Sequence, residues 1–111
     1  MSDAIERIQS AISSNKICIF MKGNRNFPQC GFSAATVQIF EQIGAPYGTV
    51  DVLSDPEVRD QVKVYSNWPT IPQVYIDGKF VGGCDIVREL YETGELETIV
   101  KAATGQSAAA R

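Results

Sequence analysis

Hydrophobic residues recur along the chain at spacings that alternate between helical and strand periods. Ile5, Ile8 and Ile12 share one face of a helix near the start. The segment KICIFM, residues 16–21, is then apolar at five consecutive positions, which predicts a strand buried on both faces. The chain therefore begins with an amphipathic helix followed by a central strand.

A polar loop, KGNRNFPQ, leads from this strand to Cys30 and a second predicted helix that ends near Gly44 and Pro46. The segment YGTVDV predicts a second strand. In the following SDPEVRDQVKVY, Ser54 and Glu57 have the spacing of a capping box, which predicts a third helix with Ser54 as its N-cap. The apolar residues that define the second helix are Ala34, Ala35, Val37, Ile39, Phe40 and Ile43.

The second half of the chain predicts a hairpin and two helices. QVYI and KFVG are joined by Asp77-Gly78, a strong hairpin signal, and Asp85 is expected to cap the helix that follows. A short helix follows Gly94. This order predicts an α/β fold: a four-stranded mixed sheet flanked by helices on both faces. We expect one domain over residues 1–103 and a flexible C-terminal tail over residues 104–111.

Composition and charge exclude several classes of protein. Ten basic and thirteen acidic residues give a net charge of −3, and without a basic block we expect no nucleic-acid partner. No apolar run approaches the ~20 residues of a membrane helix, so we expect no membrane association. The acidic, amphipathic N-terminus does not resemble a targeting segment, which favours a cytoplasmic location, although a processed protein of an organellar matrix or stroma has the same features.

The three cysteines, Cys18, Cys30 and Cys84, occupy different settings. Their odd number and irregular spacing argue against a disulfide scaffold and favour a reducing compartment. Cys18 lies inside the apolar strand, where a cysteine packs as a small hydrophobe. Cys84 follows two glycines at a turn, which fits either a packing role or a disulfide with Cys30. Only Cys30 is in a setting typical of a reactive thiol.

Cys30 precedes a helix, whose N-terminal N–H groups and dipole stabilise a thiolate. Lys22, at the end of the first strand, can add positive charge. The alternative is a cysteine that merely packs, but a polar loop containing Gly and Pro is a poor place for burial. Arg59 and Lys63, four residues apart on one helix face, can bind a carboxylate or form an ordinary solvated face. Trp68 is either a partner contact or a packed aromatic.

Four features occur in order along the chain: Lys22, CGFS at residues 30–33, WPTIP at 68–72 and GGCD at 82–85. Together they resemble the monothiol glutaredoxins of the CGFS type, over roughly Ile5 to Val100. The match is closest to single-domain bacterial and organellar members. The resemblance implies a thioredoxin-like fold, in agreement with the predicted elements.

The resemblance also implies a glutathione site beside Cys30. Pro72 is expected to be a cis-proline that exposes the Ile71 backbone for strand-like pairing with glutathione. Three cations would neutralise the glycyl carboxylate, and the backbone and side chain around Asp85 would hold the γ-glutamyl end. The implied glutathione-binding residues are Lys22, Arg59, Lys63, Thr70, Ile71, Pro72, Gly83, Cys84 and Asp85.

Two functions remain for a single reactive thiol. Ser33 replaces the second cysteine of a dithiol enzyme, so only a glutathione-dependent monothiol route to disulfide reduction is open. Alternatively, Cys30 and glutathione from each of two chains supply the four ligands of a [2Fe–2S] cluster in a homodimer. The resemblance favours the second function: cluster transfer to apo iron–sulfur proteins, with a BolA-like protein as a further partner. Any enzyme activity would then be a weak oxidoreductase activity.

Overall fold

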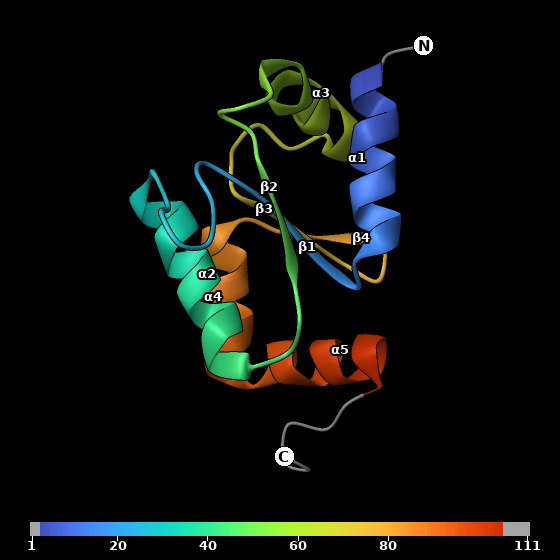
Figure 1. The fold of residues 1–111 in the computed structure, drawn as a ribbon. Coiled ribbons are helices and arrows are strands. Elements are labelled where there is room, and N and C mark those ends of the chain that lie inside the picture. The colour runs from blue at the N-terminus through green and yellow to red at the C-terminus, as the bar shows by residue number, and fades with distance from the viewer. Residues whose placement is uncertain (1–2, 106–111) are drawn as a thin grey trace.

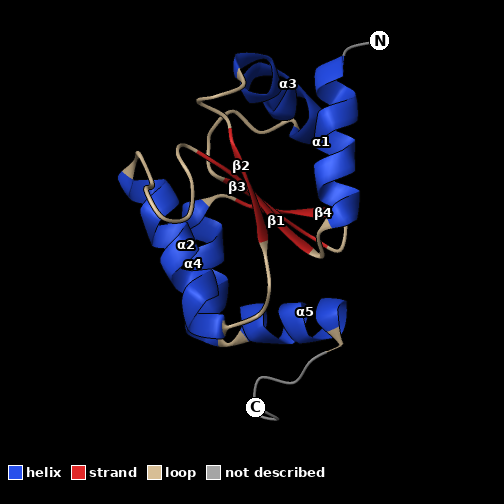
Figure 2. Ribbon diagram, viewed as in Figure 1, coloured by secondary structure: helices blue, strands red, loops and turns tan. Residues whose placement is uncertain are grey.

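Residues 3–105 are described by the computed structural model, which contains five helices and four strands over these residues (Figures 1 and 2). The order is that predicted from the sequence. The elements are α1 (Asp3–Ser14), β1 (Ile17–Met21), α2 (Gly31–Ile43), β2 (Gly48–Asp51), α3 (Pro56–Ser66), β3 (Gln73–Ile76), β4 (Lys79–Gly82), α4 (Cys84–Thr93) and α5 (Glu95–Thr104).

The four strands form one mixed sheet in the order β2-β1-β3-β4. Strand β1 pairs in parallel with β2 and antiparallel with β3, and β3 pairs antiparallel with β4. The turn between β3 and β4 contains Asp77 and Gly78, both with positive φ, as the hairpin signal predicted. Because β1 is central and covered on both faces, all five of its residues are buried.

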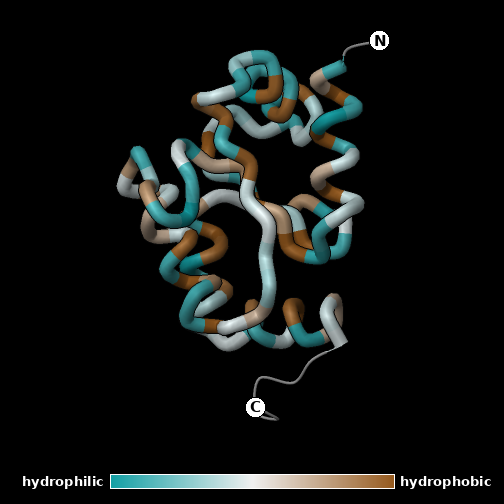
Figure 3. The backbone as a smooth tube through the Cα atoms, in the orientation of Figure 1, coloured by the Kyte–Doolittle hydropathy of each residue, from teal (hydrophilic) through white to brown (hydrophobic). Residues whose placement is uncertain are grey.

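Each face of the sheet supports a separate hydrophobic core. On one face, Ile17, Ile19 and Met21 pack with residues of α2, α4 and α5. On the other face, Cys18 and Phe20 pack with residues of α1 and α3. Figure 1 shows this division, with α1 and α3 together on one side of the strands and α2, α4 and α5 on the other. The covering helices alternate hydrophobic and hydrophilic residues (Figure 3), as expected for amphipathic helices.

Two predicted helix caps are wrong. The N-cap of α3 is Asp55, whose side chain accepts a hydrogen bond from Val58 N, and not Ser54. The residue before a proline avoids the helical conformation, so Pro56 makes Asp55 the last non-helical residue. The N-cap of α4 is Gly83, and Asp85 instead lies in the first turn of the helix.

The ends of the chain add two observations. Helix α5 includes Thr104, the first residue of the segment expected to be a tail, and residues 106–111 of that segment lie outside the described residues. Within residues 3–105, no helix combines the length and the apolar composition that spanning a membrane requires.

Candidate functional site

The loop between β1 and α2 carries Cys30 and is tied back onto the sheet. Gln29 N donates to the Lys22 carbonyl at 2.8 Å, and Gly23 forms an isolated bridge with Pro28. The Gly23 N–H also donates to Asp51 Oδ1 at 2.9 Å, which joins the loop to the end of β2. These contacts place Cys30 at the N-terminus of α2, the position predicted from the sequence.

Cys30 is the N-cap residue of α2, and its sulfur accepts a hydrogen bond from Ser33 N at 3.4 Å. Partial burial alone raises the pKa of Cys30, but the Ser33 N–H and hydroxyl, the Phe32 N–H and the Lys22 charge lower it more, so the net change is downward. The half-buried thiol is therefore stabilised as a thiolate.

Ser33 connects the thiol to the end of β1. Its hydroxyl oxygen lies 3.6 Å from Cys30 Sγ and accepts a hydrogen bond from Lys22 N at 3.1 Å. The side chain is fully buried, and when Cys30 is deprotonated the hydroxyl can accept from Lys22 N and donate its own proton to the sulfur. Ser33 thus stabilises the thiolate directly as well as replacing a second cysteine.

The other two cysteines are buried and free. Burial in the sheet raises the pKa of Cys18 from 9.0 to about 12, so this thiol stays protonated at neutral pH. Cys84 begins α4, and its sulfur accepts a hydrogen bond from Arg88 Nη2 at 3.5 Å. Cys30 is consequently the cysteine best placed to react.

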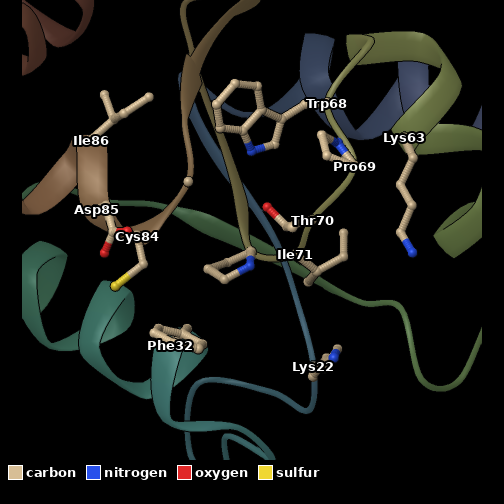
Figure 4. Close-up of a pocket in the computed structure, with 12 residues that line it drawn as sticks. Lys22, Phe32, Lys63, Trp68, Pro69, Thr70, Ile71, Cys84, Asp85 and Ile86 are labelled. Carbon is tan, nitrogen blue, oxygen red and sulfur yellow. The ribbon is translucent and has the colours of Figure 1, made fainter.

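A pocket of about 440 Å³ opens beside the N-terminus of α2 (Figure 4). It lies where the ends of β1 and α2, the loop before β3 and the start of α4 meet. Its lining residues are Lys22, Phe32, Lys63, Trp68, Pro69, Thr70, Ile71, Pro72, Gly83, Cys84, Asp85 and Ile86. The peptide bond between Ile71 and Pro72 is cis, as the resemblance led us to expect.

The pocket is electrostatically divided. Lys22 and Lys63 lie on one side, and Asp85 lies on the opposite side (Figure 4). The Asp85 side chain is 88% exposed, and its Oδ1 atom lies 3.8 Å from Arg88 Nη1. Its carboxylate therefore remains available to a ligand. A ligand with a carboxylate at one end and an ammonium group at the other would match this arrangement.

The structure brings together eight of the nine residues expected to bind glutathione, and Arg59 is the exception. Its guanidinium is 3.7 Å from Asp60, and it does not line the pocket, whereas Lys63 one turn later does. Cys30 also does not line the pocket, but it is adjacent to it, because Phe32 and Lys22 lie in the wall and Ser33 hydrogen-bonds to both Cys30 and Lys22.

Sequence reasoning missed part of the wall. The sequence alone assigned no binding role to Phe32, Pro69 or Ile86, and it left two roles open for Trp68. All four line the pocket. The position of Trp68 and Pro69 directly before Thr70 was the available signal. Within residues 3–105, no group of three or more His, Cys, Asp or Glu side chains is arranged to hold a metal ion.

Comparisons with known proteins agree on one family. The glutaredoxin family model matches residues 17–81. A monothiol glutaredoxin described as ycf64-like, from Synechocystis sp., is 54% identical over 97 residues, which cover 87% of this chain and 91% of the relative. Glutaredoxin 4 of Escherichia coli K12 is 48% identical over 101 residues, covering 91% and 88% of the two chains.

Solved structures support the same assignment. Reduced apo GrxS14 of poplar has a TM-score of 0.82 at 45% identity, with 92% of this chain and 94% of that chain covered. A buckwheat glutaredoxin-glutathione complex has a TM-score of 0.82 at 27% identity, with 91% and 90% covered. These neighbours share the thioredoxin-like fold. The family model matches most of the sheet, and the relatives match nearly the whole chain. The site itself has a single activated thiol. This chain therefore belongs to the glutaredoxin family, among its monothiol members.

Proposed function

We propose that the pocket binds glutathione and that Cys30 and glutathione together hold a [2Fe–2S] cluster between two copies of the chain, for transfer to apo iron–sulfur proteins. The observation that carries the proposal is a single activated thiol next to a pocket with cations on one side and a carboxylate on the other. A BolA-like protein is proposed as a further partner. The domain responsible is proposed to span residues 1–103, and α5 continues it to Thr104.

Glutathione carries a carboxylate at its glycyl end and an ammonium group beside a second carboxylate at its γ-glutamyl end. We expect Lys22 and Lys63, which line one side of the pocket, to bind the glycyl carboxylate, and Asp85 on the opposite side to bind the γ-glutamyl ammonium group. The Ile71 backbone lies between them, where an extended peptide can add main-chain hydrogen bonds. The buckwheat glutaredoxin-glutathione complex, similar in fold and family, further supports this ligand.

The number of available thiols supports sharing of the cluster. A [2Fe–2S] cluster takes four ligands, usually thiolates. Each chain offers Cys30, since Cys18 and Cys84 are buried. Two chains with one glutathione each would complete the set. The cluster is therefore a cargo bound through a non-protein thiol, which can leave without unfolding the carrier.

The alternative function is glutathione-dependent reduction of disulfides. It is favoured by the lowered pKa of Cys30, because a thiolate is the attacking form in thiol–disulfide exchange. Ser33 cannot resolve a mixed disulfide, so a second glutathione must do so. We propose this as the lesser activity. All three cysteines, Cys18, Cys30 and Cys84, are free thiols, which suits a reducing compartment, and we propose a cytoplasmic or equivalent organellar location.

Reconstitution tests the proposal. The reduced protein is incubated anaerobically with iron, sulfide and glutathione, and its visible absorption and solution mass are recorded. We expect a coloured dimer that forms only when glutathione is present. A colourless monomer, or a cluster formed without glutathione, would refute the carrier function. Rapid glutathione-dependent reduction of a small disulfide by the same preparation would instead favour the enzyme.

Cysteine variants identify the ligand. Cys30→Ser should abolish cluster binding and disulfide reduction, whereas Cys18→Val, a buried substitution outside the site, should preserve both. Cys84→Ser should largely retain the cluster, because the Cys84 thiol is buried and hydrogen-bonded to Arg88. Loss of the cluster in that variant would assign the Cys84 sulfur a role as a ligand.

A further inference from the structure

Gln73 is a fully buried polar residue at the start of β3. The rest of that strand is apolar or aromatic, and both hydrophobic cores lie against it. An amide costs free energy on burial unless its donors and acceptor are all hydrogen-bonded. The position therefore requires an explanation in terms of specific partners.

The Gln73 amide is fully used. Its Nε2 group donates to the carbonyl of Trp68 at 3.1 Å and to the carbonyl of Thr70 at 3.3 Å. Its Oε1 atom accepts from the Tyr75 hydroxyl at 3.1 Å. The opposite orientation of the amide would place its oxygen against the two carbonyl oxygens of Trp68 and Thr70. The contacts therefore select one orientation.

The segment held by Gln73 is a wall of the pocket, since Trp68, Thr70 and Ile71 all line it. In a trans peptide unit the C=O of one residue and the N–H of the next point in opposite directions. The Thr70 carbonyl points inward to the Gln73 amide, so the Ile71 N–H of the same peptide unit points away from Gln73, toward the pocket side of the loop. The hydrogen bond that holds the Thr70 C=O therefore also sets the direction of the Ile71 N–H.

We propose that Gln73 is a positioning residue that aims the Ile71 N–H at a main-chain acceptor of the peptide ligand without touching that ligand. This inference rests on the proposed function, because the ligand is taken to be glutathione. It assigns the affinity of the site partly to a buried side chain behind the pocket. It also gives Tyr75 a supporting role, since its hydroxyl fixes the orientation of the Gln73 amide.

Glutathione titration followed by the fluorescence of Trp68, the single tryptophan of the chain, tests the proposal. Gln73→Met keeps a similar volume but loses both donors, and we expect glutathione affinity to fall roughly three- to tenfold, the range for one misaligned hydrogen bond. Tyr75→Phe is a milder change and should weaken binding in the same direction. Unchanged affinity in Gln73→Met would overturn the proposal.

A matched control separates positioning from stability. Val74→Ala removes buried apolar atoms from the neighbouring position of β3, on the side of the sheet that faces α2, α4 and α5. The Val74 side chain is apolar, so it forms no hydrogen bond to the loop of Trp68 to Ile71. It should lower stability but leave glutathione affinity unchanged. If both variants weaken binding in proportion to their loss of stability, Gln73 has a structural role alone and the proposal is wrong.

Two further measurements keep the inference separate from the proposed function. Gln73→Glu should approach the wild-type affinity as the pH falls, because only the protonated acid can donate to a carbonyl; a constant affinity ratio would contradict this. In ligand-free protein, the Ile71 amide resonance should move more in Gln73→Met than in Val74→Ala. If the amide shift is present but the wild-type protein does not bind glutathione, the proposed ligand is wrong and the positioning role stands. If the shift is absent, the positioning role of Gln73 is wrong.

Discussion

Gly23 provides a quantitative test of how the thiol loop is built. The residue follows Lys22 and has φ of +86°, in the left-handed region. A Cβ atom at this position would lie 2.4 Å from the Phe27 carbonyl oxygen and 2.7 Å from Gln29 N. Both are backbone atoms of the loop that leads to Cys30. Gly23→Ala therefore introduces conformational strain and a clash that a side-chain rotation cannot relieve.

The two effects can be given magnitudes. A non-glycine residue in the left-handed conformation costs about 1–2 kcal/mol. Overpacking that forces backbone to move costs about 1–3 kcal/mol more. We therefore expect Gly23→Ala to lower the free energy of unfolding by about 2–5 kcal/mol, a large share of the stability of a small domain. Displacement of the loop should also slow the alkylation of Cys30 at neutral pH.

Gly44 supplies the control. It has φ of +85°, almost the same conformation, but a Cβ atom there meets nothing within 4 Å. Gly44→Ala should therefore lose only the conformational part, about 1–2 kcal/mol, and should not change Cys30 reactivity. Urea denaturation of the reduced proteins, with Trp68 fluorescence as the signal, measures the free energy of unfolding of each variant. Equal losses of stability in the two variants would refute the argument from the clash.

Three other predictions concern individual side chains. Ser33→Ala should raise the pKa of Cys30, because the thiolate loses the hydroxyl 3.6 Å away; a spectroscopic titration of the thiolate showing no rise would contradict this. Lys63→Ala should weaken glutathione binding roughly three- to tenfold at low salt, whereas Lys101→Ala, outside the pocket, should not; calorimetry can compare them. Burial raises the pKa of Cys18 from 9.0 to about 12, so the folded protein keeps a proton that the unfolded chain releases, and stability falls as the pH rises through this range. Cys18→Val should make that fall shallower, and an unchanged slope in denaturation at several alkaline pH values would argue against it.

Local sequence patterns determined the elements of this protein. Hydrophobic spacing identifies the helices and strands in their observed order, because each element must bury one face or both. The Asp77-Gly78 turn and the helix after Cys30 were also predictable, since their conformations depend on neighbouring residues. The cap of α3 shows the limit of this reasoning: a capping-box spacing favoured Ser54, but Pro56 makes Asp55 the cap.

Hydrophobic spacing alone does not indicate which residues share the pocket: the family resemblance pointed to eight of them, and the tertiary structure shows how they come together. Lys22, Lys63, Thr70 and Asp85 come from four separate segments, and the sheet order β2-β1-β3-β4 with its covering helices brings them together. Spacing placed Arg59 and Lys63 on one helix face, but the packing of α3 directs only Lys63 to the pocket wall. Gln73 carried no local signal of its role, because its three partners are defined by how the loop folds over the end of β3. Local sequence patterns therefore determined the reactive thiol and the secondary structure, because these depend on neighbouring residues. The geometry of the binding site, the exclusion of Arg59 and the role of Gln73 were decided by long-range packing.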